Sequence, residues 1–180
     1  RPDCAAVYCD LRYFFDGEPG KLYRHRYQFP SGDVFGELLQ KMFITNTTLM
    51  LRRAVVKKMG GYDENLGMVE DWDYFLRLAH AGHRFCFLPR DLVRYRLRWD
   101  NHTRFGNQVP IQESAVKIFE NLKNKMTEAE RNKYHIDYFV DKRKERLALA
   151  LLAEGKKSEA WKVLREFKGV TAKLISCFLL

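Results

Sequence analysis

Three carboxylates crowd into one short segment, at Glu70, Asp71 and Asp73, next to aromatic side chains. In the first turn of a helix each such acid stabilises the macrodipole by about 0.3–1 kcal/mol, and Asp73 can also pair with Arg77 one turn later. The neighbouring Trp72 would instead exclude water from a carboxylate and raise its pKa, which suits a general base. Residue types and spacing allow both roles, and on these grounds alone the structural role is favoured.

Cations follow this acidic cluster along the chain. Arg94, Arg96 and Arg98 occupy alternate positions in a segment with strand character, so we expect them on one side of a strand with apolar groups on the other. Guanidinium groups bind phosphate oxygens and stabilise charge that grows on a leaving group. A helix with a base beside an arginine strand could therefore activate a hydroxyl nucleophile and hold a diphosphate in one cleft.

The elements that must position these residues follow from periodicity. Apolar alternation predicts strands, a 3.6-residue period predicts helices, and Gly and Pro mark their ends. Pro89 is expected to close a strand, and Gly82 to end the helix that carries the carboxylates. On these signals we predict strands over 4–14, 23–29, 43–53, 83–89 and 91–103, and helices over 34–42, 54–59 and 69–81.

Beyond residue 106 the composition changes. Gly becomes scarce and helix formers dominate, which predicts a helix over 111–125 and a helix–turn–helix over 146–167. The latter resembles a single tetratricopeptide-type hairpin, although an ordinary helical hairpin is the simpler interpretation. We therefore predict an α/β domain over 1–106, with a mixed sheet and flanking helices, and an all-α extension over 107–180.

Bulk composition narrows the class of protein. Hydrophobic residues make up 46% and charged residues 31%, which suits a soluble folded protein. The net charge of +9 is spread over both halves, and no Lys/Arg block resembles a nucleic-acid arm. A mildly basic protein can bind phosphorylated ligands, nucleic acid or an anionic membrane face, and a basic surface that is simply solvated is an equal alternative. No apolar run has transmembrane length. The four cysteines form no C-x-x-C pair, which predicts free thiols in a reducing compartment.

The run from Ile44 to Thr103 resembles the second half of a family 2 glycosyltransferase with the GT-A fold. Three motifs in the family's order carry the resemblance: "LRRAVVKKMGGYDE", "EDWDYFLRLAHAG" and "LPRDLVRYR". Residues 1–20 resemble the stretch immediately after that family's metal-binding D-x-D segment. That segment and the nucleotide-binding half are not in this sequence, so we interpret the chain as an acceptor-side, C-terminal portion of such an enzyme, inactive by itself.

The resemblance implies an inverting transfer of a sugar from a nucleotide-sugar to a glycan or lipid-linked acceptor, as in polysaccharide biosynthesis. It makes Asp71 the general base that takes the acceptor's proton. Glu70 would contact the acceptor, and Trp72 would pack beneath the site or stack on a sugar. The family's His two residues after the Tyr-Arg pair is Arg98 here, and His102 is the alternative metal ligand. The leaving diphosphate is assigned to Arg94, Arg96 and Arg98.

The same resemblance implies further properties of the parent enzyme. It would use Mg²⁺ or Mn²⁺, which this chain alone is not expected to bind, and it would work in the cytoplasm or at the inner membrane face. A sheet that has lost neighbouring strands would expose an edge and self-associate. Two alternatives stay open: a non-catalytic interaction module built on the helical hairpin, and, less favoured, a basic nucleic-acid-binding module. The sequence does not name the donor sugar or the acceptor.

Overall fold

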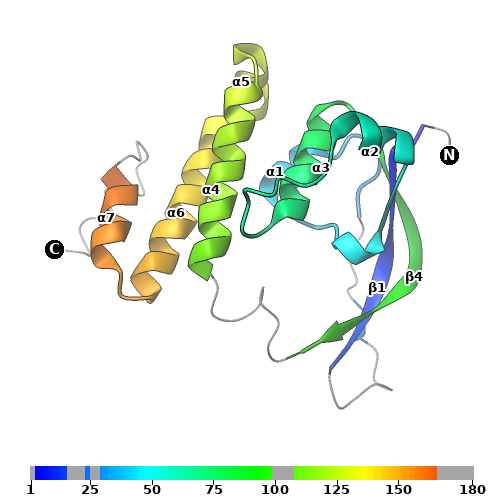
Figure 1. Ribbon diagram of the computed structural model, residues 1–180, viewed down its shortest axis with the longest axis horizontal. Coiled ribbons are helices and arrows are strands. Elements are labelled where there is room, and N and C mark those ends of the chain that lie inside the picture. Colours follow the sequence, from blue (N-terminus) through cyan, green and yellow to red (C-terminus); the bar gives the residue numbers. More distant parts are fainter. Residues whose placement is uncertain (1–2, 16–22, 25–28, 99–107, 166–180) are drawn as a thin grey trace. The chain divides into compact units, whose positions relative to one another are not determined.

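The computed structural model of the 180-residue chain describes residues 3–15, 23–24, 29–98 and 108–165 (Figure 1). The chain forms two compact units, one of Arg1–Glu64 with Glu70–Asn101 and the other of Asn65–Val69 with His102–Leu180. The first unit combines a mixed sheet with helices, and the second is helical. The predicted fold class, α/β followed by a helical extension, is therefore confirmed. The domain boundary after residue 106 stays a prediction.

Strand β1 (Ala6–Phe15) is the central strand of the sheet. It pairs antiparallel with β3 (Leu49–Leu51) near its start and with β2 (Tyr23–Arg24) near its end, where a hairpin partner was predicted. The same residues of β1 also pair in parallel with β4 (Phe85–Leu97), so β4 lies along the opposite edge of β1. Figure 1 shows β1 and β4 as one long twisted ribbon.

Strand β4 runs through Pro89, so the prediction that this residue closes a strand is wrong. Its partners on β1 explain why: Cys9 pairs with Leu88, but the next residue, Asp10, pairs with Asp91. Pro89 therefore lies in a bulge. The sheet forms no ladder hydrogen bond at this position, so the N–H that proline lacks is not needed. Beyond the bulge the exposed arginines alternate with half-buried apolar residues, which confirms the predicted one-sided arginine strand.

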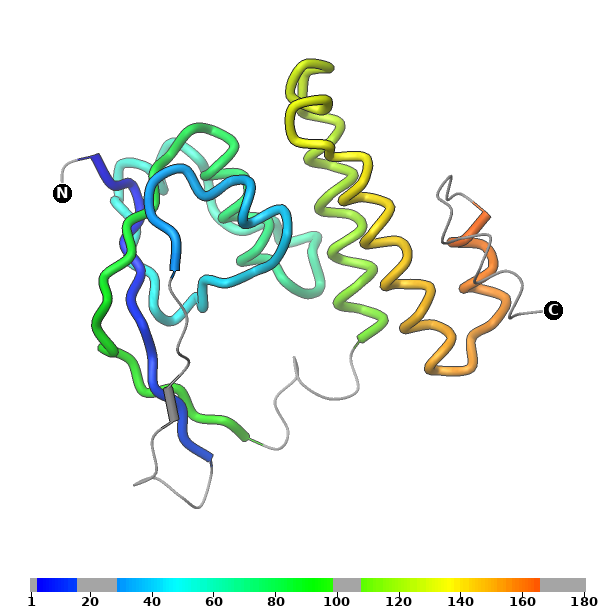
Figure 2. Tube along the Cα trace, turned by 180° about the vertical axis from the view of Figure 1, so that it is seen from behind, coloured from blue at the N-terminus to red at the C-terminus, as the bar shows by residue number. Residues whose placement is uncertain are grey.

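Helices α1 (Phe35–Gln40) and α3 (Glu70–His80) cover one face of the sheet, as Figures 1 and 2 show. Phe75 of α3 lies with its ring centroid 6.3 Å from that of Phe85 in β4, and both are fully buried. A 3₁₀ turn (Asn46–Thr48) replaces the first half of the strand predicted over 43–53. Helix α2 (Arg53–Met59) follows β3. Positive φ angles at Gly60 and Gly82 end α2 and α3, as predicted.

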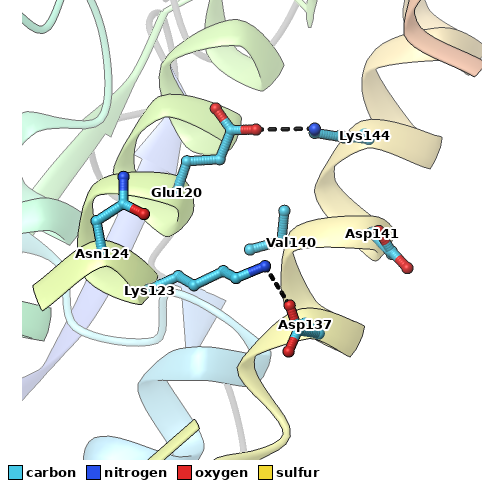
Figure 3. A pocket seen from close by; sticks show the side chains of 7 residues that line it. All are labelled: Glu120, Lys123, Asn124, Asp137, Val140, Asp141 and Lys144. Atoms are coloured by element: carbon cyan, nitrogen blue, oxygen red, sulfur yellow. Dashed lines mark ion pairs between the residues drawn. The ribbon is translucent and has the colours of Figure 1, made fainter. Parts of the chain in front are cut away.

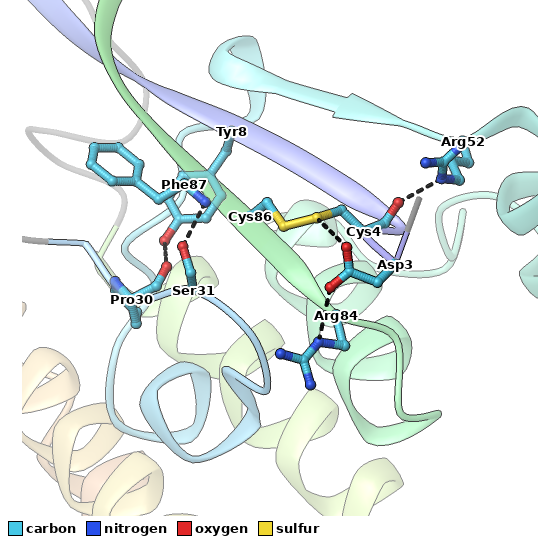
Figure 4. Close-up of a disulfide and its surroundings, with 9 residues drawn as sticks. All are labelled: Asp3, Cys4, Tyr8, Pro30, Ser31, Arg52, Arg84, Cys86 and Phe87. Atoms are coloured by element: carbon cyan, nitrogen blue, oxygen red, sulfur yellow. Dashed lines mark hydrogen bonds and ion pairs between the residues drawn. A yellow bond between two sulfur atoms is a disulfide. The ribbon is translucent and has the colours of Figure 1, made fainter. Parts of the chain in front are cut away.

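A disulfide joins Cys4 to Cys86 (Figure 4), so the prediction of free thiols is wrong for these two residues. Parallel pairing of β1 with β4 brings their Cα atoms to 5.9 Å, which is within disulfide range. The two cysteines are 82 positions apart in the sequence, where spacing gives no sign of pairing. Cys9 is a free cysteine, and Cys177 lies outside the described residues.

The second unit contains α4 (Gln108–Lys125), α5 (Glu128–Tyr134), α6 (Ile136–Ala153) and α7 (Lys157–Arg165). Helices α6 and α7 form the predicted hairpin. Helix α5 was not predicted, although its capping box, Thr127 with Glu130, has a recognisable sequence signature. Arg143 of α6 is buried with its guanidinium over the Phe119 ring, and this burial lowers its pKa to about 10.

A groove of about 630 Å³ lies between α4 and α6 (Figure 3). Two ion pairs cross it, Lys123 with Asp137 and Lys144 with Glu120, so the charged lining of the groove is used in holding the two helices together. None of the helices in the described part of the chain is long and apolar enough to cross a membrane.

Candidate functional site

Helix α3 places the three carboxylates in its first turn, above a buried apolar face. Its position is set by Trp72, which is 7% exposed and donates its indole N–H to the carbonyl oxygen of Leu38 in α1 at 2.8 Å. Val69, the residue before the helix, has a φ of 54°. A β-branched residue rarely adopts this conformation, and such strain is concentrated at functional sites.

Asp73 has a structural role in this helix. Its carboxylate accepts a 2.7 Å hydrogen bond from the guanidinium of Arg77, as the i,i+4 spacing predicted, and its side chain is 13% exposed. Arg77 also donates to the carbonyl oxygens of Met59 and Gly61, so it ties α3 to the end of α2. The Asp73 carboxylate is therefore part of the ion pair that helps to join α3 to α2.

Asp71 is in a different environment, although it is only two residues away. It is half-buried, its Oδ1 accepts a 2.8 Å hydrogen bond from the amide N–H of Trp72, and it forms no ion pair with any residue that the structure describes. Burial raises the pKa of the Asp71 carboxyl; the Trp72 N–H opposes this rise and the negative charge of Glu70 adds to it. A carboxylate of raised basicity without a cationic partner is suited to accept a proton.

Glu70 and Trp72, the two residues predicted to contact an acceptor, lie on either side of Asp71 in the sequence but differ in burial. Glu70 is half-buried on the first turn of α3. Trp72 points into the protein toward α1. Of the two roles considered for this residue, its burial favours packing beneath the site over stacking on a sugar ring.

Replacing Trp72 with Phe is expected to lower the free energy of unfolding by about 1–3 kcal/mol. The ring would still fill much of the space, but the Leu38 carbonyl would lose its buried donor. Urea unfolding followed by circular dichroism measures this change. Tyr138→Phe is a useful control, because that hydroxyl belongs to a residue that is 59% exposed and should change stability little. Equal effects in the two variants would contradict the buried-donor explanation.

The arginine strand lies on β4, at the end of the sheet that extends past the bulge. Arg94 pairs in register with Arg12, and Arg96 pairs with Phe14, so these four side chains share one face. The Arg96 guanidinium lies 5.8 Å from the Phe14 ring centroid, and Arg12 pairs with Asp91. Arg98 is also exposed, just after the strand. His102, the predicted alternative metal ligand, lies outside the described residues.

The described residues do not fit the divalent metal that the resemblance implies. Within the ranges that the structure describes, no three His, Cys, Asp or Glu side chains gather closely enough to hold an ion. Asp71-Trp72-Asp73 has the D-x-D form, but Asp73 is bound to Arg77 and Trp72 points away into the core. Of the two carboxylates in this motif, only that of Asp71 lacks an ion-pair partner among the described residues.

In the α/β unit, a half-buried carboxylate with no ion-pair partner among the described residues lies in the first turn of α3, and β4 carries exposed arginines. The sequence matches the model of the Glycosyltransferase like family 2 over residues 2–146. The match covers most of the chain, which therefore belongs to this family. It continues through α4 and α5 into α6. No curated protein sequence matches the chain.

Two features of the site were not predicted from the sequence. The positive φ of Val69 could not be predicted from the sequence, because β-branched residues rarely adopt this conformation. The anchoring of Arg77 by the carbonyls of Met59 and Gly61 depends on how α2 meets α3. The Gly60-Gly61 pair was a partial signal, since it marks where the backbone turns toward α3.

Proposed function

We propose that this domain is the acceptor-side part of an inverting glycosyltransferase and that Asp71 is its general base. The observation that carries the proposal is the contrast between Asp71 and Asp73. One carboxylate is held by a guanidinium, while the other is half-buried, has a raised pKa and has no ion-pair partner among the described residues. A general base needs a free carboxylate within reach of the proton and a pKa raised toward the working pH.

In the proposed reaction Asp71 takes the proton of the acceptor hydroxyl as that oxygen bonds to the anomeric carbon of the donor sugar. The bond from that carbon to the diphosphate oxygen breaks on the opposite face, which inverts the configuration. The nucleoside diphosphate leaves with the bonding electron pair. Glu70 contacts the acceptor, and Trp72 holds the base in position from below. The growing negative charge on the diphosphate is stabilised by Arg94, Arg96 and Arg98.

Replacing Arg96 with Gln is expected to lower kcat/KM for the nucleotide-sugar by roughly tenfold, because a charge-assisted hydrogen bond to the leaving group would be lost. Initial rates over a range of donor concentrations measure this. Arg90→Gln is the matched control: Arg90 is an exposed arginine of the same strand, but it lies in the bulge. If both variants lose activity equally, a specific diphosphate contact is contradicted.

The function itself is tested with the longest natural form of the protein, incubated with common nucleotide-sugars and with glycan and lipid-linked acceptors. Acceptor-dependent release of nucleoside diphosphate, with and without Mg²⁺ or Mn²⁺, is the readout. If no donor and acceptor pair gives release above that of the Asp71→Asn variant, the transferase proposal is wrong.

The predicted location in the cytoplasm or at its membrane face has one observation against it, the disulfide, because such bonds persist mainly in oxidising compartments.

A further inference from the structure

Tyr62 is an exposed aromatic residue that packs against the helix carrying Asp71, and the proposed reaction gives it no role. It lies after α2, in the sequence "GGYDE". Its hydroxyl donates a 2.9 Å hydrogen bond to Oδ1 of Asn46, and its ring centroid lies 5.3 Å from that of Tyr74 in an edge-to-face arrangement. The residue is nevertheless 44% exposed. Tyr62 is therefore held at two points while part of it stays open to solvent.

Tyr74 links the Tyr62 ring to the carboxylates of α3. Tyr74 follows Glu70 by four residues and Asp71 by three, so the three residues are neighbours on the helix surface. Side chains on a helix lean toward its N-terminus, so the Tyr74 ring lies over the turn that carries the two acids. Tyr74 is only 3% exposed, whereas Tyr62, which packs on its ring, is exposed. Tyr62 therefore borders the first turn of α3 on the solvent side.

Polar groups that can bind hydroxyls accompany this ring. The carboxylates of Glu70 and Asp71 form no ion pair with any residue in the described part of the chain. Asn46 is exposed, and it accepts the hydrogen bond from Tyr62 with its oxygen, so its amide nitrogen can donate to a ligand. Carboxylates accept hydrogen bonds and an amide N–H donates them, so together they match the hydroxyl groups of a sugar.

From this arrangement we propose that Tyr62 is the residue on which a sugar ring of the acceptor stacks, so that the acceptor is a neutral saccharide. This inference rests on the proposed transferase function. The C–H groups on one face of a pyranose form an apolar surface that packs on an aromatic ring. Asn46 acts as a positioning residue, and because it already holds the tyrosine, little side-chain entropy is lost on binding. Tyr62 thus supplies the stacking surface that the buried Trp72 does not.

Charge distinguishes a neutral sugar from the other flat ligands that stack on a tyrosine. A nucleobase would stack as well, but its phosphates would come near the carboxylates of Glu70 and Asp71, and like charges repel. An acidic sugar would be disfavoured for the same reason. The hydroxyl groups of a neutral sugar can instead donate hydrogen bonds to both carboxylates. The charges beside Tyr62 therefore favour a neutral saccharide.

The test is calorimetric titration of the purified full chain with the neutral oligosaccharides cellotetraose, maltotetraose and chitotetraose. At least one of them is expected to bind. Tyr62→Ala and Tyr62→Leu should each bind it about tenfold more weakly, because both lack the aromatic face and Leu keeps apolar bulk. Tyr62→Phe keeps the ring but loses the hydrogen bond to Asn46, so it should bind about threefold more weakly. Circular dichroism melts establish that each variant is folded.

The matched control is Tyr138→Ala, which removes an aromatic side chain from a residue of the helical unit that is 59% exposed. It should bind as the unaltered protein does. The proposal is overturned if none of the three oligosaccharides binds, if folded Tyr62→Leu binds as tightly as the unaltered protein, or if Tyr138→Ala loses as much as Tyr62→Ala. It is also overturned if Tyr62→Ala weakens the binding of uridine diphosphate but not that of an oligosaccharide.

The same titration separates this inference from the assignment of the base. Asp71→Asn should still bind the oligosaccharide, because stacking does not require a proton acceptor. In the complete enzyme, Tyr62→Leu should raise KM for the acceptor and leave KM for the nucleotide-sugar unchanged. Sugar transfer with an unaltered acceptor KM in this variant would overturn the stacking role alone. Oligosaccharide binding that depends on Tyr62, in a protein that transfers no sugar, would overturn the transferase proposal and leave Tyr62 as a glycan-binding residue.

Discussion

Asp71→Asn is expected to lower the rate of sugar transfer in the complete enzyme by about 10²–10⁴-fold, the usual contribution of a positioned general base. Asn has the same shape and can still accept the hydrogen bond from the Trp72 amide, but its amide oxygen cannot take up a proton at neutral pH. The substitution also removes a charge that burial disfavours. Activity should therefore collapse while the fold survives.

The pH dependence of stability distinguishes this carboxylate from a structural one. Burial raises the pKa of the Asp71 carboxyl in the folded state, so the folded state favours its protonated form. The stability gained from this carboxyl is fully present below its pKa in the unfolded state and is lost as the pH rises through its pKa in the folded state. Above that pKa the unaltered protein holds a poorly solvated charge that Asp71→Asn lacks. The variant should then be as stable as the unaltered protein, or more stable, at neutral pH.

Asp73→Asn is the matched control for Asp71→Asn, since it makes the same change on the same helix. It would weaken the 2.7 Å ion pair with Arg77 and is expected to cost about 1–3 kcal/mol of stability. Its effect on turnover should follow from that loss of stability alone. Thermal melts and initial rates of both variants give the comparison. Unchanged turnover in Asp71→Asn, or equal loss of turnover in two folded variants, would contradict the assignment of the base.

Reduction of the Cys4–Cys86 disulfide is expected to lower the free energy of unfolding by about 2–5 kcal/mol. The bond closes a long loop, because its cysteines are 82 positions apart in the sequence, and so restricts the unfolded chain strongly. It also links the segment just before β1 to the second residue of β4, next to the pairing that joins these two strands. Urea unfolding with and without dithiothreitol measures the effect.

Cysteine variants make this experiment specific. Cys86→Ser should unfold at lower urea concentration and should no longer respond to dithiothreitol, whereas Cys9→Ser should behave as the unaltered protein does, because Cys9 is free. Alkylation of the unfolded, unreduced chain should leave the two bonded cysteines unlabelled. If Cys4 and Cys86 are labelled without reductant, or if stability ignores dithiothreitol, the disulfide does not form in solution.

Local chemistry made much of this protein predictable from its sequence. A 3.6-residue period and the glycines at positions 60 and 82 indicate where α2 and α3 lie, because helix formation and its ends depend on residues close in sequence. Strand alternation likewise predicts that Arg94 and Arg96 share a face. Three motifs in one order, of which the segment around Asp71 is the second, indicated the family, and the match over residues 2–146 shows it.

Long-range pairing decided the rest. Cys4 meets Cys86, and Pro89 falls in a bulge, only because β4 pairs with β1 in one particular register, which no short segment of either strand contains. Asp71 and Asp73 have the same side chain in the same helical turn, and they differ because only Asp73 faces Arg77, which the carbonyls of α2 and its following turn anchor. The two acids are close together because they are close in the sequence. Their side chains differ in burial and in ion pairing because the residues around them come from distant segments of the chain.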